Sequence, residues 1–188
     1  MNLYEFFCLF HPITPDEFQI MEDQFVHIHS KKGTFLTRSG EIQKNLYFVQ
    51  SGYQMSYFET EEKSTVMAFT YSPGLCAIPD SFFNQTPARY DLCCLTDSEF
   101  SVISRDKLEK IFDRSQNIER LFRKMTEQIL CGLIERHLER NTLNMEERFL
   151  KFCKRSPHLL NVIPHKYLAS YLGIDPTNFS KLFNSVKI

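Results

Sequence analysis

The sequence predicts an α+β protein, in which an N-terminal jelly roll or β-roll precedes a long central helix and a C-terminal helix-turn-helix. Eight short β-rich segments, separated by turn residues, fill residues 25–103, which is typical of a jelly roll or small barrel. An apolar stripe at helical spacing then runs from 116 to 141, and two short amphipathic segments joined by a glycine close the chain. We therefore expect a roll (1–113), a central helix (114–143) and a C-terminal domain (144–188).

The elements of the roll follow from caps and turns. The stretch Thr14-Pro15-Asp16-Glu17 has the composition of a capping box with proline in the first turn, so it should start a helix that ends near Gln24. Ser104 should cap a second short helix, Arg105–Phe112. Between them, strands are expected at 25–30, 34–37, 46–50, 53–58, 64–71, 75–78, 90–95 and 99–103.

The central helix carries more apolar surface than one neighbour can cover. We expect it to contact the roll on one side and its own copy on the other, as a parallel homodimer. Gly132 in its middle is unfavourable for a helix, and the close approach of a partner backbone would explain it. The predicted dimer interface consists of Ile118, Phe122, Met125, Ile129, Gly132 and Leu133.

The C-terminal segment reads as two short helices joined by a turn. Asn144 and Glu147 form a capping box for a preceding helix, and Pro164 can open the first helix of the pair. Gly173 is a left-handed stop, and Asp175-Pro176 restarts a helix as its N-cap and first residue. An αα-hairpin with a solvated outer face is the simpler alternative. A helix with small polar groups and a lysine outward suits the major groove of double-stranded DNA. The candidate DNA-binding residues are Lys166, Thr177, Asn178, Ser180, Lys181 and Asn184.

Charge and composition narrow the class further. Residues 148–188 hold seven Lys and Arg against one Asp, whereas residues 1–112 hold nine against fifteen Asp and Glu. Positive charge therefore gathers beside the predicted DNA-binding helices.

No apolar run approaches the ~20 residues that cross a bilayer. No export signal is recognisable and the six cysteines include no CxxC pair, so we expect a cytoplasmic protein with reduced thiols and no membrane partner.

Taken in order, the motifs resemble the Crp/Fnr family of transcription regulators. Lys32-Gly33, Ser39-Gly40-Glu41, Leu46-Tyr47-Phe48-Val49 and Ser51-Gly52 are similar to the pattern of its cyclic-nucleotide-binding β-roll. Asn144–Arg148 resembles the hinge after its dimer helix, and Ile163–Lys181 resembles its winged helix-turn-helix. The resemblance implies a homodimer whose effector-binding roll controls DNA binding, with RNA polymerase as a further partner.

The sequence departs from the family pattern at both functional sites. The Gly-Glu of the phosphate-binding cassette is replaced by Ile78-Pro79 or Pro79-Asp80, and Arg89 lies one position beyond its expected place. At the adenine-reading positions of the central helix stand Leu133 and Ile134, which cannot hydrogen-bond a base. We therefore expect an unidentified small-molecule effector, or none, rather than cyclic AMP. The candidate pocket residues are Gly74, Ile78, Pro79, Asp80, Ser81, Arg89, Tyr90, Leu133 and Ile134.

On the recognition helix, Pro176, Thr177 and Lys181 replace the Arg-Glu-x-x-x-Arg pattern, so a different target sequence is expected.

Two other classes remain open. His27-Ile28-His29 is similar to the metal-binding pair of cupin enzymes, but a cupin motif has a glycine before the pair and a glutamate soon after it, and this chain has neither. The second alternative is a dimeric ligand-binding or scaffold protein that has lost DNA binding. No catalytic triad, P-loop or dinucleotide fingerprint is present, so we expect no enzymatic activity, no metal and no cofactor.

Overall fold

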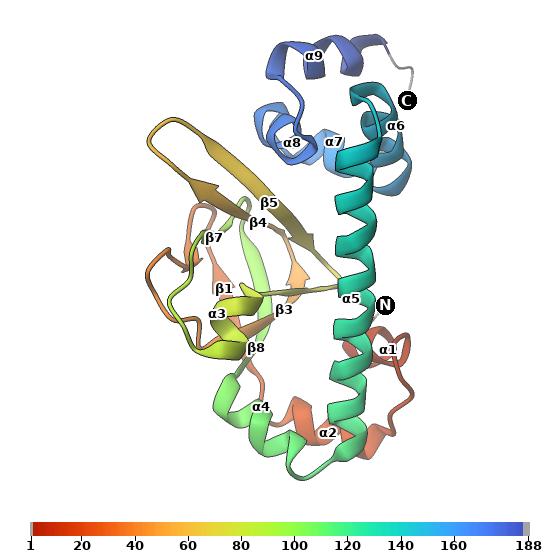
Figure 1. Cartoon of the computed structure of the whole chain (residues 1–188). Helices are drawn as coiled ribbons and strands as arrows, with labels where there is room; N and C mark the ends of the chain where they lie inside the picture. The colour runs from red at the N-terminus through yellow and green to blue at the C-terminus, as the bar shows by residue number, and fades with distance from the viewer. Residues whose placement is uncertain (1, 186–188) are drawn as a thin grey trace.

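The computed structural model describes residues 2–185 and contains the predicted roll, long helix and C-terminal helices (Figure 1). The strands are β1 (Val26–Ser30), β2 (Phe35–Thr37), β3 (Asn45–Ser51), β4 (Tyr53–Glu59), β5 (Ser64–Tyr71), β6 (Gly74–Cys76), β7 (Asp91–Cys94) and β8 (Ser98–Ser104). They form two antiparallel four-stranded sheets, in the orders β1-β8-β3-β6 and β2-β7-β4-β5. All eight predicted strands are present, and the predicted fold class is confirmed.

The two sheets face each other over an apolar interior. Tyr47 and Phe100 of the first sheet and Leu92 and Cys94 of the second belong to one buried cluster. Successive side chains of a strand point to opposite faces of its sheet. On the edge strand β1, Ile28 therefore faces the interior of the roll, and His27 and His29 face outward. Both histidines are exposed, and no group of three potential metal ligands occurs among residues 2–185.

Two N-terminal helices pack between the roll and the long helix. They are α1 (Leu3–Cys8), which the sequence analysis missed, and α2 (Pro15–Glu22), which starts at the predicted Thr14 capping box. Phe7 of α1 is fully buried, and its ring lies 5.1 Å from that of Phe48 on β3. Two further helices flank the last strands of the roll: α3 (Pro79–Asn84) after β6 and α4 (Arg105–Phe112) after β8.

The long helix α5 (Gln116–Thr142) runs beside the roll from the end near α2 and α4 up to the C-terminal helices, which it joins to the roll (Figure 1). Its first half packs into the core formed with α1, α2 and α4, where Ile118, Phe122 and Met125 are at most 8% exposed. The prediction that these three residues face a second copy is therefore wrong. The apolar stripe of α5 is divided between an internal half and an exposed half.

The C-terminal part consists of α6 (Met145–Arg155), α7 (Leu159–Val162), α8 (His165–Leu172) and α9 (Pro176–Ser185) around a small core. Phe149 of α6 and Phe179 of α9 meet edge to face at its centre, with ring centroids 5.4 Å apart. Among residues 2–185, no helix combines the length and hydrophobicity that crossing a lipid bilayer requires.

Helix α8 rests on β5, the outermost strand of the second sheet (Figure 1). The backbone N–H of Val66 donates to the Ser170 hydroxyl over 3.0 Å, and this hydroxyl donates to the Ser64 carbonyl over 3.1 Å. The rings of Phe69 and Tyr171 pack beside this contact, 5.3 Å apart. The C-terminal helices are therefore held by the roll as well as by α5.

Candidate nucleic-acid interface and effector pocket

The outer face of α9 is polar and exposed. Asp175 caps the helix, since its carboxylate accepts from the backbone N–H of Thr177 at 2.9 Å. Phe179 is fully buried, which fixes the inner face of the helix. The opposite side is formed by the predicted DNA-binding residues of α9: Thr177, Ser180, Lys181 and Asn184 are exposed, and Asn178 is half-buried. The structure thus places these five residues on one accessible helix.

Lys166 is exposed on α8, and its ammonium lies 4.8 Å from the centre of the Tyr167 ring. Together with Lys181, it gives this end of the molecule two accessible cations on different helices. The described part of the C-terminal helices contains a single acidic residue after Glu147, which is Asp175. Its carboxylate is engaged at the start of α9. Residues 148–185 thus hold six Lys and Arg against one acidic residue, although Glu146 and Glu147 precede them at the start of α6.

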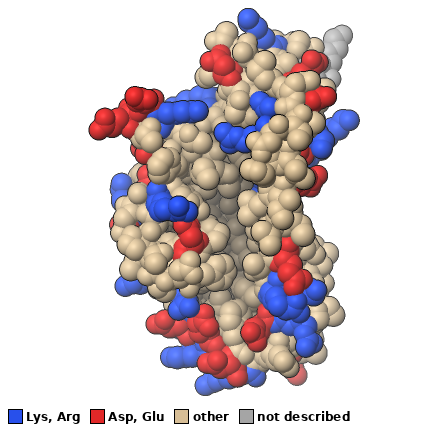
Figure 2. Space-filling model, in the orientation of Figure 1, with Lys and Arg blue, Asp and Glu red and all other residues tan. Residues whose placement is uncertain are grey.

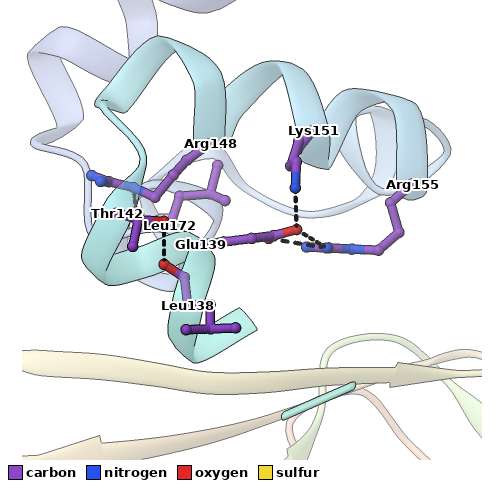
Figure 3. Close-up of polar contacts among 7 residues, drawn as sticks. All are labelled: Leu138, Glu139, Thr142, Arg148, Lys151, Arg155 and Leu172. Carbon is purple, nitrogen blue, oxygen red and sulfur yellow. Dashed lines mark hydrogen bonds and ion pairs between the residues drawn. The ribbon is translucent and has the colours of Figure 1, made fainter. Parts of the chain in front are cut away.

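The turn between α8 and α9 is fixed by its conformation and by an arginine. Gly173 ends α8 with φ +64°, a left-handed conformation that glycine adopts without strain. The Arg148 guanidinium donates to the carbonyl of Leu172 at 3.1 Å, and both residues are drawn in Figure 3. It also donates to the carbonyls of Gly173 at 3.4 Å and Leu143 at 2.6 Å. One side chain thus connects the end of α5, the start of α6 and the turn before α9.

A buried carboxylate joins α5 to α6 on the other side of this connection. Glu139 is 9% exposed, although most of the second half of α5 is exposed. Its carboxylate pairs with Arg155 at 3.2 Å and with Lys151 at 3.4 Å (Figure 3). A buried carboxylate without such partners would be costly, so the two cations fix the angle between the helices. No local motif revealed this contact, because it joins residues on two separate helices.

The cassette region folds into α3, but its polar groups are already paired within the chain. The backbone N–H of Ile78 donates to the Gln43 side chain at 2.8 Å. The fully buried Ser81 hydroxyl accepts from the Gln43 N–H at 2.9 Å and donates to the Thr86 carbonyl at 2.7 Å. Pro79, the first residue of α3, has no N–H to offer. These groups stabilise the loop and leave few donors for a ligand.

Asp80 and Arg89 pair with each other at this site. The Arg89 guanidinium lies 3.2 Å from the Asp80 carboxylate, and the Arg89 side chain is 79% exposed. This exposure places the arginine outside the roll, although the neighbouring Ala88 is buried. Burial raises the pKa of the half-buried Tyr90 to about 12, so its phenol remains neutral. An added side chain at Gly74 would overlap the Tyr71 carbonyl, which indicates a structural role for this glycine.

Leu133 and Ile134 lie apart from the buried clusters of the roll. They belong to the exposed half of the α5 stripe, which we call the α5 apolar face; it consists of Ile129, Leu130, Leu133, Ile134 and Leu138. Each of these residues is between 46% and 56% exposed. Apart from the local backbone of α5 and the two neighbouring residues, no described atom lies within 4 Å of the position that a Cβ at Gly132 would occupy. Figure 2 shows uncharged surface over the middle of the α5 side, between charged clusters at the two ends.

Residues 27–115 match the family model of the cyclic nucleotide-binding domain. The fold of the chain is similar to that of the catabolite activator protein of Thermus thermophilus, at 19% identity over 94% of this chain and 85% of that one, with a TM-score of 0.59. It is also similar to FixK2 of Bradyrhizobium japonicum, at 16% identity over 85% and 83% of the two chains, with a TM-score of 0.72.

A regulator described as a Crp/Fnr family member, from Eubacterium rectale, gives a TM-score of 0.70 at 14% identity over 92% of this chain and 82% of that one. No curated protein matches the sequence significantly. The roll is thus of the cyclic nucleotide-binding type, and the resemblance to the Crp/Fnr family is confirmed for the fold, which this chain shares with these regulators at low sequence identity.

Proposed function

We propose that the chain is a dimeric, DNA-binding transcription regulator of Crp/Fnr type whose effector is not a cyclic nucleotide. The polar, exposed face of α9 is the observation that carries this proposal. It presents hydroxyl, amide and ammonium groups, which can donate to base edges and phosphates in the major groove. Lys181 is the group best suited to guanine, and Lys166 contributes a phosphate contact.

Dimerisation is supported by the α5 apolar face. Five large apolar residues on one helix face, each about half exposed, are more than a monomer normally leaves in contact with water. Pairing of this face across a two-fold axis buries it and places two copies of α9 at the same end of the assembly. Two recognition helices can then meet successive major-groove turns about 34 Å apart.

The geometry of the cassette argues against a cyclic nucleotide as the effector. A cyclic phosphate needs free donors, whereas here Asp80 presents a negative carboxylate in the first turn of α3. Arg89, the natural cation for a phosphate, is held by that carboxylate. At the adenine-reading positions, Leu133 and Ile134 are exposed on α5 and offer no hydrogen bond. Any coupling from the roll to the C-terminal helices has a direct route through Ser170 and β5.

Fluorescence anisotropy with fragmented genomic DNA at several salt concentrations tests DNA binding. We expect the logarithm of the affinity to fall linearly with the logarithm of the salt concentration, because each phosphate contact releases counterions. Lys181→Ala and Lys166→Ala should each reduce the slope by about one unit. Lys110→Ala is the matched control and should leave the slope unchanged, because it lies on α4, at the opposite end of the molecule from α9 (Figure 1).

The scaffold alternative makes the opposite prediction. A dimeric protein that has lost DNA binding would show no salt-dependent affinity, although its mass in solution would still be that of two chains. Light scattering and anisotropy on the same sample therefore separate the two functions. A monomer with no affinity for DNA at low salt would refute both.

A further inference from the structure

The concave face of the first sheet is left partly uncovered at one end of the roll. On β1, β8 and β3, inward positions are occupied by Val26 and Ile28, by Val102 and by Tyr47; the pairing brings Val26 and Tyr47 each opposite Val102. The opposing strands β2 and β7 are short, with three and four residues, and none of their residues lines this end. A pocket of about 280 Å³ remains there.

The floor of this pocket is apolar and rigid. Tyr47 and Val102 are each 7% exposed, and the Tyr47 ring packs edge to face on Phe100 at 5.5 Å. The Tyr47 hydroxyl donates to the Leu36 carbonyl of the opposite sheet at 3.3 Å. Val26 at the mouth is 55% exposed, an unusual degree for an inward-facing strand position. The apolar floor that a ligand would cover is therefore held in place by contacts within the roll, without a ligand.

The rim of the pocket is polar and carries one positive charge. Gln24, Asn45, Ser104 and Lys107 surround the opening, and Lys107 is the only residue of the lining that is charged at neutral pH. Its ammonium lies 3.5 Å from the Gln24 carbonyl, which keeps it at the opening. The Ser104 hydroxyl accepts from the Lys107 N–H in the first turn of α4, so the positive end of this helix also faces the rim.

We propose that this pocket binds a small apolar carboxylic acid. The aliphatic or aromatic body would cover Val26, Ile28, Tyr47 and Val102, and the carboxylate would pair with Lys107 and accept from Asn45 or Ser104. A volume near the ~300 Å³ lower end of ligand pockets fits a molecule of about ten non-hydrogen atoms. An apolar cavity with a single cation at its rim excludes cationic ligands and favours acids over neutral molecules of the same shape. The site shares no residue with the cassette and does not depend on DNA binding.

Titration of the full chain with octanoate, followed by amide NMR spectra, tests the inference. We expect the largest shifts at the amides of residues 26–28 and 102–107, and an affinity for octanoate at least tenfold above that for octanamide. Lys107→Gln should remove this difference, because the charged partner is lost. Lys110→Gln, an exposed change on the same helix outside the pocket, is the matched control and should keep the difference.

Val26→Trp fills the mouth of the pocket from an exposed position, so the roll should still fold, which its NMR dispersion will show. It should abolish binding of both probes. Three results would overturn the inference: octanoate shifts no amide of the pocket, octanamide binds as tightly as octanoate, or the folded Val26→Trp protein retains its affinity for octanoate.

Discussion

Within α5, Leu121 is fully buried, whereas Leu130, only nine residues further on, is 56% exposed. Both belong to the same apolar stripe and share the same helical periodicity. The first half of the stripe packs against α1, α2 and α4, whereas the second half extends beyond this core and is exposed. The comparison teaches that periodicity identifies a buried helix face but does not say whether the cover comes from the same chain or from a second one.

The largest expected effect separates the two halves directly. Leu121→Ala should lower the free energy of unfolding by about 2–5 kcal/mol, because it leaves a cavity in the core of the roll. The same substitution at Leu130 should cost the monomer no more than about 0.5 kcal/mol. Urea unfolding at low protein concentration measures both. Equal losses would show that the two halves have the same environment.

A charge on the α5 apolar face should affect association instead of folding. Leu133→Glu places a carboxylate in the proposed interface, and we expect it to weaken dimerisation about 100-fold, which corresponds to about 2.7 kcal/mol. Sedimentation equilibrium measures the dissociation constant. Gln128→Glu introduces the same charge on the opposite side of α5 and should change little. A wild-type protein that is monomeric at all concentrations would contradict the proposed pairing.

Glu139 differs from the other residues in the second half of α5, because it is buried against α6 of the same chain. Glu139→Gln should destabilise the C-terminal helices by about 2 kcal/mol, because Arg155 and Lys151 lose a charged acceptor. Glu135→Gln, at an exposed position on the same helix, is the control. Hydrogen exchange of the α6 amides should accelerate only in the first variant. Equal protection in both variants would show that the ion pairs do not hold α6.

The smallest effect concerns the contact that does not involve α5. Ser170→Ala removes two hydrogen bonds to β5 and should cost about 1 kcal/mol. The Val66 amide should then exchange faster with solvent, whereas the β4 amides paired with β7 should not change. Unchanged protection of Val66 would mean that the aromatic contact of Phe69 and Tyr171 alone keeps α8 on the roll.

Local signals in the sequence predicted most of the fold. The capping residues Thr14, Ser104 and Asn144, and the glycine stop at Gly173, act within a few residues of themselves, and each lies where the sequence placed it. Helix α1 was missed, although Asn2 and Glu5 form a capping box of the same kind. That signal was present in the sequence and could have been used.

The candidate sites were harder to predict, because their contacts join distant residues. Arg155 reaches Glu139 across a hinge, and Ser170 contacts Val66 over 104 positions. The pocket at Lys107 combines side chains of three strands and two helix ends, none of which forms a motif alone. The exposed face of α9 was predicted because it depends only on the spacing of residues along one helix.

The seat of α8 on β5 has a consequence for the solubility of the roll. A terminal strand presents unpaired backbone groups that can recruit a strand from another molecule, and here the Ser170 hydroxyl occupies two of them. A roll cut off before Asn144 would expose this strand together with Phe69. Such a fragment should aggregate through β5 unless a substitution such as Val66→Lys places a charge on this strand. The C-terminal helices therefore also prevent β5 from pairing with the edge strand of another molecule.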